Sequence, residues 1–275
     1  MPELPEVEVT RRGIDQPLRS ARVLSARLGK PLRWPLGVAP EALAGATIGP
    51  VGRRGKYLWL PLDGGGAPGG LLLHLGMSGS LALSRAAAPP GPHDHFDLTT
   101  TQGTLRLTDP RRFGAVVWSP SLADDPAARL LASLGPEPFD PALTPASFFA
   151  ALHARRAPVK TVLLSGELIV GAGNIYACEA LHEAGIDPRL RCEQISRVRA
   201  TRLLAALRST LARALDLGGS TLRNFRDAHG ISGEFQSQAR VYGRAGESCQ
   251  RCGGGIRRIV QAQRASFFCP GCQKR

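Results

Sequence analysis

The chain has 275 residues, 43% of them hydrophobic, with no apolar run long enough to cross a membrane, which favours a soluble globular protein over a membrane protein. Its formal net charge of +13 favours a polyanionic partner, most often nucleic acid and less often an anionic membrane surface, although a basic protein without such a partner stays possible. The first residues lack the basic and apolar segments of a secretory signal. We therefore expect a reducing compartment, and the six cysteines are not disulfides by default.

The first predicted element is an amphipathic helix over residues 3–19. Pro2 precedes it, acidic residues occupy its first turns and arginines come later, an order that suits the helix dipole. From about residue 22 to 118, short apolar or alternating runs recur between turn residues, which predicts the strands of a sandwich or barrel.

A stretch rich in proline and aspartate at about 120–145 marks the predicted domain boundary, and helical patterns follow it. The clearest helix carries a stripe of leucines and ends at Gly218 and Gly219. The stripe consists of Leu203, Leu204, Leu207, Leu211 and Leu215.

The basic residues of the chain are almost all arginine. Only four of the 35 are lysine, namely Lys30, Lys56, Lys160 and Lys274, so a lysine that persists can mark a place that needs a compact ammonium.

The strongest spacing signal is a pair of C-x2-C motifs near the C-terminus, separated by a segment that fits two strands and a turn. The four cysteines are Cys249, Cys252, Cys269 and Cys272. Four thiolates complete a tetrahedral zinc site and leave no open position, so we expect one structural Zn²⁺ rather than redox pairs. The remaining two, Cys178 and Cys192, are expected to be ordinary buried thiols.

The segment MPELPEVE allows two interpretations. Removal of Met1 would expose Pro2 as an amine, and an α-amino group with a pKa of about 7.7–8 is a far better nucleophile at pH 7 than a lysine at about 10.4. Glu3 could then transfer a proton. The other interpretation is a helix start with favourable acidic charges, and composition alone favours it.

Eight motifs are spread along the whole chain, namely MPELPEVE, GRRGKYLWL, LHLGMSGSL, HDHFDL, TDPRRFGA, VGAGNIYACEALHEAGIDP, VYGRAGE and QRASFFCPGC. Together they resemble the motifs of bacterial formamidopyrimidine-DNA glycosylase, a base-excision repair family. The resemblance implies an α+β multidomain fold. An N-terminal helix and β-sandwich domain would span 1–135, a helical domain with a helix–two-turns–helix element 136–238, and a zinc-finger hairpin 239–275.

The resemblance also implies the chemistry of the site. Pro2 would be the nucleophile that attacks C1′ of the damaged nucleotide, and Glu3 the general acid. Lys56 matches a lysine near the phosphate and the active-site amine, and Arg264 matches the arginine assigned to the late elimination step. Removal of oxidised purines, such as 8-oxoguanine and formamidopyrimidines, would be followed by β,δ-elimination.

Further residues match DNA-binding positions of the family. Met77, Arg111 and Phe113 would fill the void left by the extracted base, and their flanks look like turns. Glu6 would help to orient the N-terminus, and Asn174 is predicted to be an N-cap that faces phosphate. The other positions that match DNA contacts are His93, Arg156 and Tyr242.

The loop at 220–238 matches the segment that covers the flipped base, although its GISGEF sequence departs from the usual pattern. We expect a monomer that is cytoplasmic and nucleoid-associated and acts on double-stranded DNA, with no membrane partner. Two alternatives are an endonuclease VIII-like glycosylase for oxidised pyrimidines and a zinc-finger DNA-binding protein without catalysis. The intact set of Pro2, Glu3, Lys56 and Arg264 argues against the second.

Overall fold

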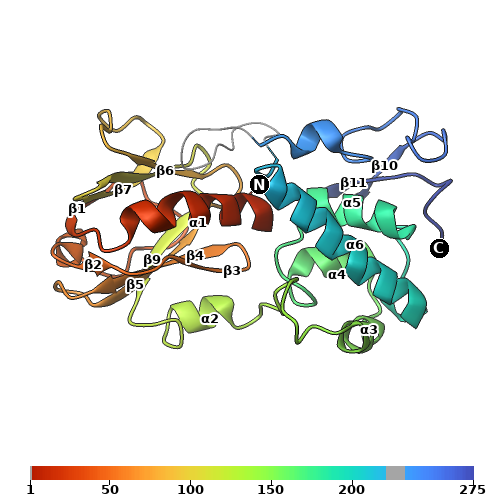
Figure 1. Ribbon diagram of the computed structural model, residues 1–275, viewed down its shortest axis with the longest axis horizontal. Helices are drawn as coiled ribbons and strands as arrows, with labels where there is room; N and C mark the ends of the chain where they lie inside the picture. The colour runs from red at the N-terminus through yellow and green to blue at the C-terminus, as the bar shows by residue number, and fades with distance from the viewer. Residues whose placement is uncertain (1, 221–232) are drawn as a thin grey trace. The chain divides into compact units, whose positions relative to one another are not determined.

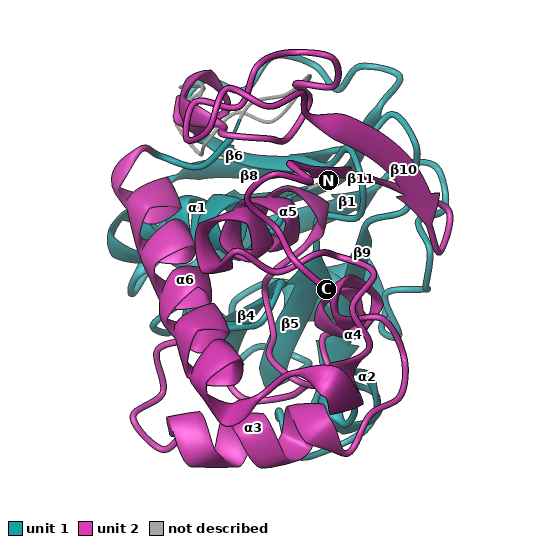
Figure 2. Ribbon diagram, turned by 90° about the vertical axis from the view of Figure 1, so that its right-hand side faces the viewer, with its two compact units in different colours: residues 1–133, 218–233 teal, residues 134–217, 234–275 magenta. Residues whose placement is uncertain are grey.

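The chain divides into two units, which Figure 2 shows in different colours. Unit 1 comprises residues 1–133 and 218–233, and unit 2 comprises residues 134–217 and 234–275. The computed structural model describes residues 2–220 and 233–275. Met1 and most of the predicted lesion loop, residues 221–232, lie outside the described residues. The domain limits at 135 and 238 stay predictions.

Unit 1 begins with helix α1 (Leu4–Leu18), which confirms the helix predicted at the N-terminus. Glu3 is its N-cap residue and Pro5 lies in its first turn, where proline costs no hydrogen bond. Its buried face includes Val7, Ile14 and Leu18, which join the core of the unit. The helix contacts strands of both sheets of this unit, so its first turn is fixed by packing as well as by local sequence.

Two antiparallel sheets form most of the rest of unit 1, as Figure 1 shows. The first has the order β1-β7-β8-β6, and these strands are β1 (Val23–Leu28), β7 (Asp94–Thr100), β8 (Gly103–Thr108) and β6 (Ser80–Ser84). The second has the order β2-β4-β5-β9, with β3 also paired to β4. These strands are β2 (Thr47–Ile48), β3 (Gly52–Arg54), β4 (Tyr57–Asp63), β5 (Gly69–His74) and β9 (Ala115–Ser119).

Alternation explains how the sheets bury a shared core. In β4, Leu58, Leu60 and Leu62 are buried while the residues between them are not, as expected of a strand with one face inward. The cluster of buried residues draws on α1 and on strands of both sheets. The predicted β-sandwich is thus confirmed. Two short helices, η1 (Pro40–Leu43) and α2 (Ala127–Leu131), complete the unit.

Unit 2 is mainly helical and has a separate core. Its helices are α3 (Pro145–His153), α4 (Val159–Ser165), α5 (Asn174–Ala184), η2 (Cys192–Gln194), α6 (Arg197–Asp216) and η3 (Phe235–Gln238). The predicted leucine stripe lies in α6, where Leu203, Leu207 and Leu211 are buried. Ser196 caps α6 by accepting a hydrogen bond from the backbone N–H of Arg199.

A two-stranded hairpin ends the chain, as the sequence predicted. It consists of β10 (Arg257–Gln261) and β11 (Arg264–Phe268), paired so that Gln261 lies opposite Arg264. The two turn residues, Ala262 and Gln263, have φ values of 45° and 60°. Two left-handed residues in succession are typical of the type I′ turn, which matches the twist of the strands.

Across residues 2–220 and 233–275, we find no helix with the length and the apolar character that a bilayer crossing requires.

Candidate active site and metal centre

The start of α1 is held by the carboxylate of Glu6. Pro2, Glu3 and Glu6 are all buried. The Oε2 atom of Glu6 accepts a hydrogen bond from the backbone N–H of Glu3 at 2.7 Å, and its Oε1 atom accepts one from the backbone N–H of Ser220 at 2.7 Å. One carboxylate therefore fixes the backbone directly after Pro2 and joins it to a segment more than 200 residues away in sequence.

The segment that meets Glu6 needs glycine. Gly219 has a φ of +83°, and a Cβ atom there would lie 3.0 Å from the Oε1 atom of Glu6. The sequence analysis identified Gly218 and Gly219 only as the end of a helix. Their approach to the N-terminus was missed, because a glycine pair signals a turn but does not say what the turn packs against.

Lys56 lies in the two-residue turn between β3 and β4, where Arg54 pairs with Tyr57. Gly55, directly before it, has a φ of +56°. The lysine is half-buried. Burial, followed by the positive charges of Lys56 and Arg33, lowers the pKa of His74 to about 4. His74 is neutral at physiological pH, and its Nδ1 atom accepts a hydrogen bond from the backbone N–H of Gly76 at 3.0 Å.

Asp109 organises the turns that carry the predicted void-filling residues. Its buried carboxylate accepts hydrogen bonds from Ser78 Oγ at 2.6 Å and from the backbone N–H of Gly114 at 2.7 Å. It also accepts one from the backbone N–H of Arg111 at 3.2 Å. Its own backbone N–H donates to the carbonyl of His93 at 2.8 Å. One aspartate thus joins three segments of unit 1.

The side chains on these turns are accessible, as their flanks predicted. Phe113 is 43% exposed, which is unusual for a large apolar side chain. The guanidinium of Arg111 lies over its ring, 4.9 Å from the centroid. Met77 is half-buried and His93 is exposed. The sequence analysis missed Asp109, although an Asp before Pro-Arg-Arg in a turn is a recognisable signal.

In unit 2, Lys160 and Asn174 join α4 and α5 to strand β11. Lys160 is fully buried, and its Nζ atom donates to Asn174 Oδ1 at 2.6 Å, to Ser266 Oγ at 2.7 Å and to the carbonyl of Ala265 at 2.9 Å. Asn174 Nδ2 donates to the same carbonyl at 2.9 Å and to the hydroxyl of Tyr242 at 3.3 Å. The residue after Arg264 is therefore held by two donors.

The prediction that Asn174 is an N-cap is wrong by one position. Gly173 is the N-cap residue of α5, and Asn174 is the first residue of the helix. Its side chain bonds Lys160, Ala265 and Tyr242, contacts that the local sequence could not reveal. Lys160 was noted only as one of four lysines, yet its burial matches the idea that a persistent lysine marks a need for a compact ammonium.

Tyr242 is positioned by a buried carboxylate that sequence reasoning also missed. Glu179 accepts hydrogen bonds from the backbone N–H groups of Arg240, Val241 and Tyr242, at 2.8, 2.9 and 2.8 Å. The ring of Tyr242 packs edge-on against Phe267, with centroids 5.0 Å apart. Arg156, in contrast, lies in the connection between α3 and α4 with its side chain 88% exposed.

The four cysteines of the two C-x2-C motifs lie together. Their sulfur atoms are all within 4.8 Å of one another. The Sγ atoms of Cys249 and Cys272 are 3.8 Å apart, and those of Cys252 and Cys269 are 3.4 Å apart. Zn–S bonds of about 2.3 Å would place tetrahedral sulfur atoms about 3.8 Å apart, so this group needs only small shifts of its sulfur atoms to bind a zinc ion.

The backbone of the second motif lies close to the sulfur atoms of this cysteine group. A Cβ atom on Gly271 would lie 3.0 Å from the sulfur of Cys252, so glycine directly before the second cysteine of the second motif, Cys272, leaves room for that sulfur. Cys178 is buried in the same apolar cluster as Cys249 and Cys269, whereas Cys192 is buried in the helical core of unit 2. Burial raises the pKa of each of these two thiols to about 11. They are the ordinary buried thiols that the sequence predicted.

Three protein-family models match the chain in succession. They are the formamidopyrimidine-DNA glycosylase N-terminal domain over residues 1–116, the H2TH domain of the same glycosylase over 134–226, and a zinc finger found in FPG and IleRS over 246–275. The four close cysteines lie within the last match, and they form the binding site of one structural zinc ion.

Relatives match over the full length. The formamidopyrimidine-DNA glycosylase of Variovorax paradoxus is 57% identical over 274 residues, covering 100% of both chains. The crystal structure of the MutM (FPG) protein from Thermus thermophilus is 39% identical, with a TM-score of 0.89 over 99% of this chain and 98% of that one. A Lactococcus lactis FPG mutant in complex with Fapy-dG-containing DNA is 32% identical, with a TM-score of 0.89 and full coverage of both chains.

Proposed function

This chain belongs to the formamidopyrimidine-DNA glycosylase family, and we propose that it excises oxidised purines from duplex DNA and then cleaves the strand. The substrates would be 8-oxoguanine and formamidopyrimidines. The observation that carries the proposal is the double hydrogen bond of Glu6, which fixes the backbone directly after Pro2. A nucleophile on a fixed backbone reacts faster than one on a frayed terminus, because its orientation is set in advance.

In the proposed mechanism, Met1 is removed and the amine of Pro2 attacks C1′ of the lesion. The bond from C1′ to the base breaks, Glu3 supplies a proton, and an iminium links the protein to the opened sugar. The iminium makes the 2′ proton acidic, so β-elimination breaks the bond to the 3′ oxygen. A δ-elimination then breaks the bond to the 5′ oxygen.

Lys56 and Arg264 would supply positive charge to this chemistry, Lys56 near the phosphate and the amine and Arg264 in the late elimination step. The support for Arg264 is its position, because the next residue, Ala265, accepts hydrogen bonds from Lys160 and Asn174. The zinc ion would hold the same hairpin from the other end of β11, where Cys269 follows Phe268. Zinc would thus act on catalysis only by positioning Arg264.

The remaining predicted residues would either bind the DNA backbone or occupy the space of the flipped nucleotide. Met77, Arg111 and Phe113 would fill the void left by the flipped nucleotide, and their accessibility on turns supports this role. Asn174, at the start of α5, would present backbone N–H groups to phosphate. His93, Arg156 and Tyr242 would contact the DNA strand. We also propose that the protein is monomeric, cytoplasmic and nucleoid-associated.

Borohydride trapping tests the nucleophile. Reduction on duplex DNA with 8-oxoguanine opposite C should cross-link protein to DNA, and mass spectrometry should find the link at an N-terminal peptide that begins with Pro2. E3Q should reduce the excision rate at least about 100-fold, within the range for loss of a general acid. The matched control is E8Q on the same helix, because Glu8 pairs with Arg11 and Arg53 instead. A cross-link at another residue, or equal effects of E3Q and E8Q, would refute this mechanism.

The product distribution tests Arg264. We expect R264A to form the cross-link and complete β-elimination while the δ-elimination product falls sharply. R258A removes an equal charge from β10 of the same hairpin and should leave the ratio of the two products unchanged.

The same cleavage assay on DNA that contains thymine glycol separates purine from pyrimidine specificity. Faster release of thymine glycol than of 8-oxoguanine would favour the endonuclease VIII-like alternative.

A further inference from the structure

His182 is a buried polar residue that none of the proposed chemistry uses. It lies near the C-terminal end of α5 and is only 2% exposed. Its Nε2 atom is 3.5 Å from the sulfur of Cys249. Its other ring nitrogen, Nδ1, has no hydrogen-bond partner within the described part of the chain. The one polar contact of this imidazole is therefore with a cysteine of the zinc site.

The direction of that hydrogen bond follows from the chemistry of the two groups. A cysteine that binds zinc is a thiolate, which accepts hydrogen bonds and has no proton to donate. The Nε2 atom must therefore carry the hydrogen, whether the ring is neutral or charged. An apolar side chain would fill the same volume, so packing alone does not call for an imidazole here.

Two of the other thiolates have backbone donors. Cys252 accepts from the backbone N–H of Gly254, and Cys269 accepts from the backbone N–H groups of Cys272 and Gly271. These donors come from the turns of the two motifs themselves. Cys249, in contrast, receives its hydrogen bond from a helix 67 residues earlier in the chain. Four thiolates around one divalent ion carry excess negative charge, and each donor reduces it.

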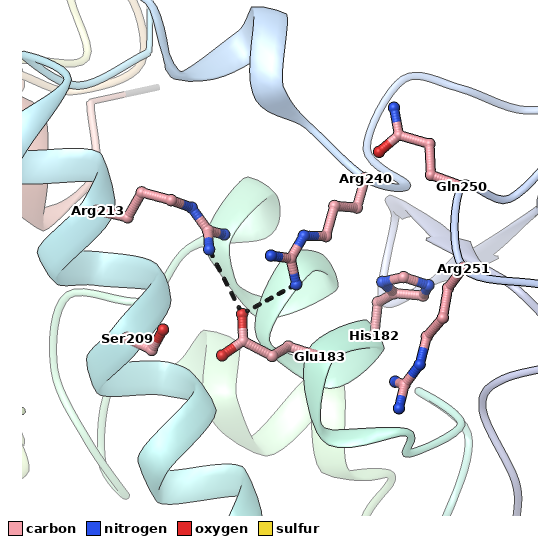
Figure 3. Close-up of a pocket in the computed structure, with 7 residues that line it drawn as sticks. All are labelled: His182, Glu183, Ser209, Arg213, Arg240, Gln250 and Arg251. Carbon is pink, nitrogen blue, oxygen red and sulfur yellow. Dashed lines mark hydrogen bonds and ion pairs between the residues drawn. The ribbon is translucent and has the colours of Figure 1, made fainter.

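Figure 3 shows the surroundings of His182. The residue lies in the wall of a cavity of about 470 Å³, which Arg213, Arg240 and Arg251 also line. The carboxylate of Glu183 pairs with Arg213 at 3.6 Å and with Arg240 at 3.3 Å, as the dashed lines mark. His182 thus separates the buried sulfur of Cys249 from this basic, solvent-accessible cavity.

We propose that His182 is a positioning residue of the zinc site, and that its N–H···S bond to Cys249 strengthens zinc retention. The bond also holds the finger to α5. The finger is joined to the start of this helix through Asn174 and Ala265, and to its end through His182 and Cys249. These two attachments are eight residues apart, or about 12 Å along the helix. Between these two attachments, Glu179 of α5 also accepts hydrogen bonds from the backbone of residues 240–242, so the contact of His182 extends an existing line of support for the hairpin that carries Arg264.

Zinc release and cobalt spectroscopy test this proposal without reference to DNA cleavage. H182F keeps an aromatic ring and removes the donor, whereas H182Q keeps an N–H group at similar reach. We expect H182F to release zinc to a chelator at least about 10-fold faster than wild type, as for other outer partners of metal ligands. In the cobalt-substituted protein, H182F should shift the sulfur-to-cobalt charge-transfer band. H182Q should restore most of both properties, and H153F, at an exposed histidine of α3, should change neither.

Two outcomes would overturn the proposal. One is that H182F retains zinc and leaves the charge-transfer band where wild type has it. The other needs no variant, in case H182F does not fold. Long-range ¹H–¹⁵N spectra of the wild-type zinc protein identify which ring nitrogen carries the hydrogen, and a neutral ring protonated only at Nδ1 would exclude the bond. Because both readouts concern the metal site, failure of the proposed glycosylase activity would leave them unaffected.

Discussion

Lys160 illustrates how a single residue can hold several parts of a site in place. It is a buried cation whose acceptors include one oxygen on α5 and two on β11. Hydrogen bonds to a charged donor are stronger than neutral ones, and each buried acceptor that loses its donor is left with an uncompensated cost. An arginine could not make the same contacts, because its planar fork does not fit three acceptors around one point.

We therefore expect K160M to destabilise unit 2 by about 3 kcal/mol, since it leaves buried acceptors without their donor. Helical circular dichroism reports mainly on unit 2, whereas Trp34, Trp59 and Trp118 all lie in unit 1. In a urea titration, the dichroism transition should move to lower concentration while the tryptophan fluorescence transition stays in place. K30M, at an exposed lysine, is the control and should move neither. Equal behaviour of K160M and K30M would contradict this role.

His74 predicts a pH dependence. Its pKa is lowered to about 4, mainly by burial and then by the charges of Lys56 and Arg33. The unfolded chain takes up a proton below about pH 6.5 and the folded one resists until about 4, so stability falls as the pH drops between these values. Protonation of Nδ1 would also break its hydrogen bond with Gly76, next to Met77.

The tryptophan fluorescence transition measures this effect. Between pH 7 and 4.5, wild type should lose about 2–3 kcal/mol more stability than H74Q, which does not titrate. H153Q, at an exposed histidine of unit 2, should lose as much as wild type. Parallel pH profiles for wild type and H74Q would show that the pKa of His74 is not depressed.

At the scale of elements, the turn after β5 and the turn before β9 pack directly against each other. Asp109 bonds Ser78 in one turn and Gly114 in the other. Gly76 brings them into contact, because a Cβ atom there would collide with the backbone of Phe113 and Gly114. The accessible side chains of Met77 and Phe113 are thus placed by close packing of two turns, and not by the strands alone.

G76A should force these turns apart. Gly76 has a φ of +62°, so alanine there would meet both left-handed strain and a collision. G64A is the matched control, because Gly64 has a φ of +74° with nothing within 4 Å. We expect G64A to cost about 1–2 kcal/mol of stability from strain alone, and G76A clearly more. Fluorescence of 2-aminopurine opposite a lesion should then show poorer filling of the void by G76A only.

At the scale of the whole molecule, charge and cores are divided between the units. The half of the chain from residue 136 onward has 20 basic and 11 acidic residues, a net charge of +9, against +4 for the first half. Unit 1 has one core and unit 2 has another, so a change in one need not unfold the other. The zinc site belongs to unit 2 and lies beside a small cluster of buried residues of its own.

Removal of zinc should consequently loosen unit 2 alone. Without the metal, we expect hydrogen exchange to rise in residues 239–275 and at the start of α5, where Lys160 and Asn174 bond β11. Peptides from the β-sandwich should exchange as before, and DNA binding should be lost. If exchange at the start of α5 stayed unchanged, or if strand cleavage survived complete removal of the metal, the hairpin would have no positioning role.

The sequence by itself determined the parts of this protein whose signals are local. The helix at the N-terminus, the strands of the sandwich, the leucine stripe of α6 and the four zinc ligands follow from periodicity and spacing, which a chain carries whatever it packs against. Motifs in fixed order were enough to indicate the family.

Only the tertiary structure decided which residues hold the site in place. Ser220 meets Glu6 across 214 positions, Lys160 meets Ser266 across 106, and His182 meets Cys249 across 67. Such pairs cannot be recognised from sequence periodicity. A hydrogen bond between distant segments depends on the path of the chain in three dimensions and not on the residues beside each partner. Asn174 is a further example. The local sequence predicted a helix cap, but the side chain of Asn174 contacts β11 and Tyr242 and not the turn that precedes it.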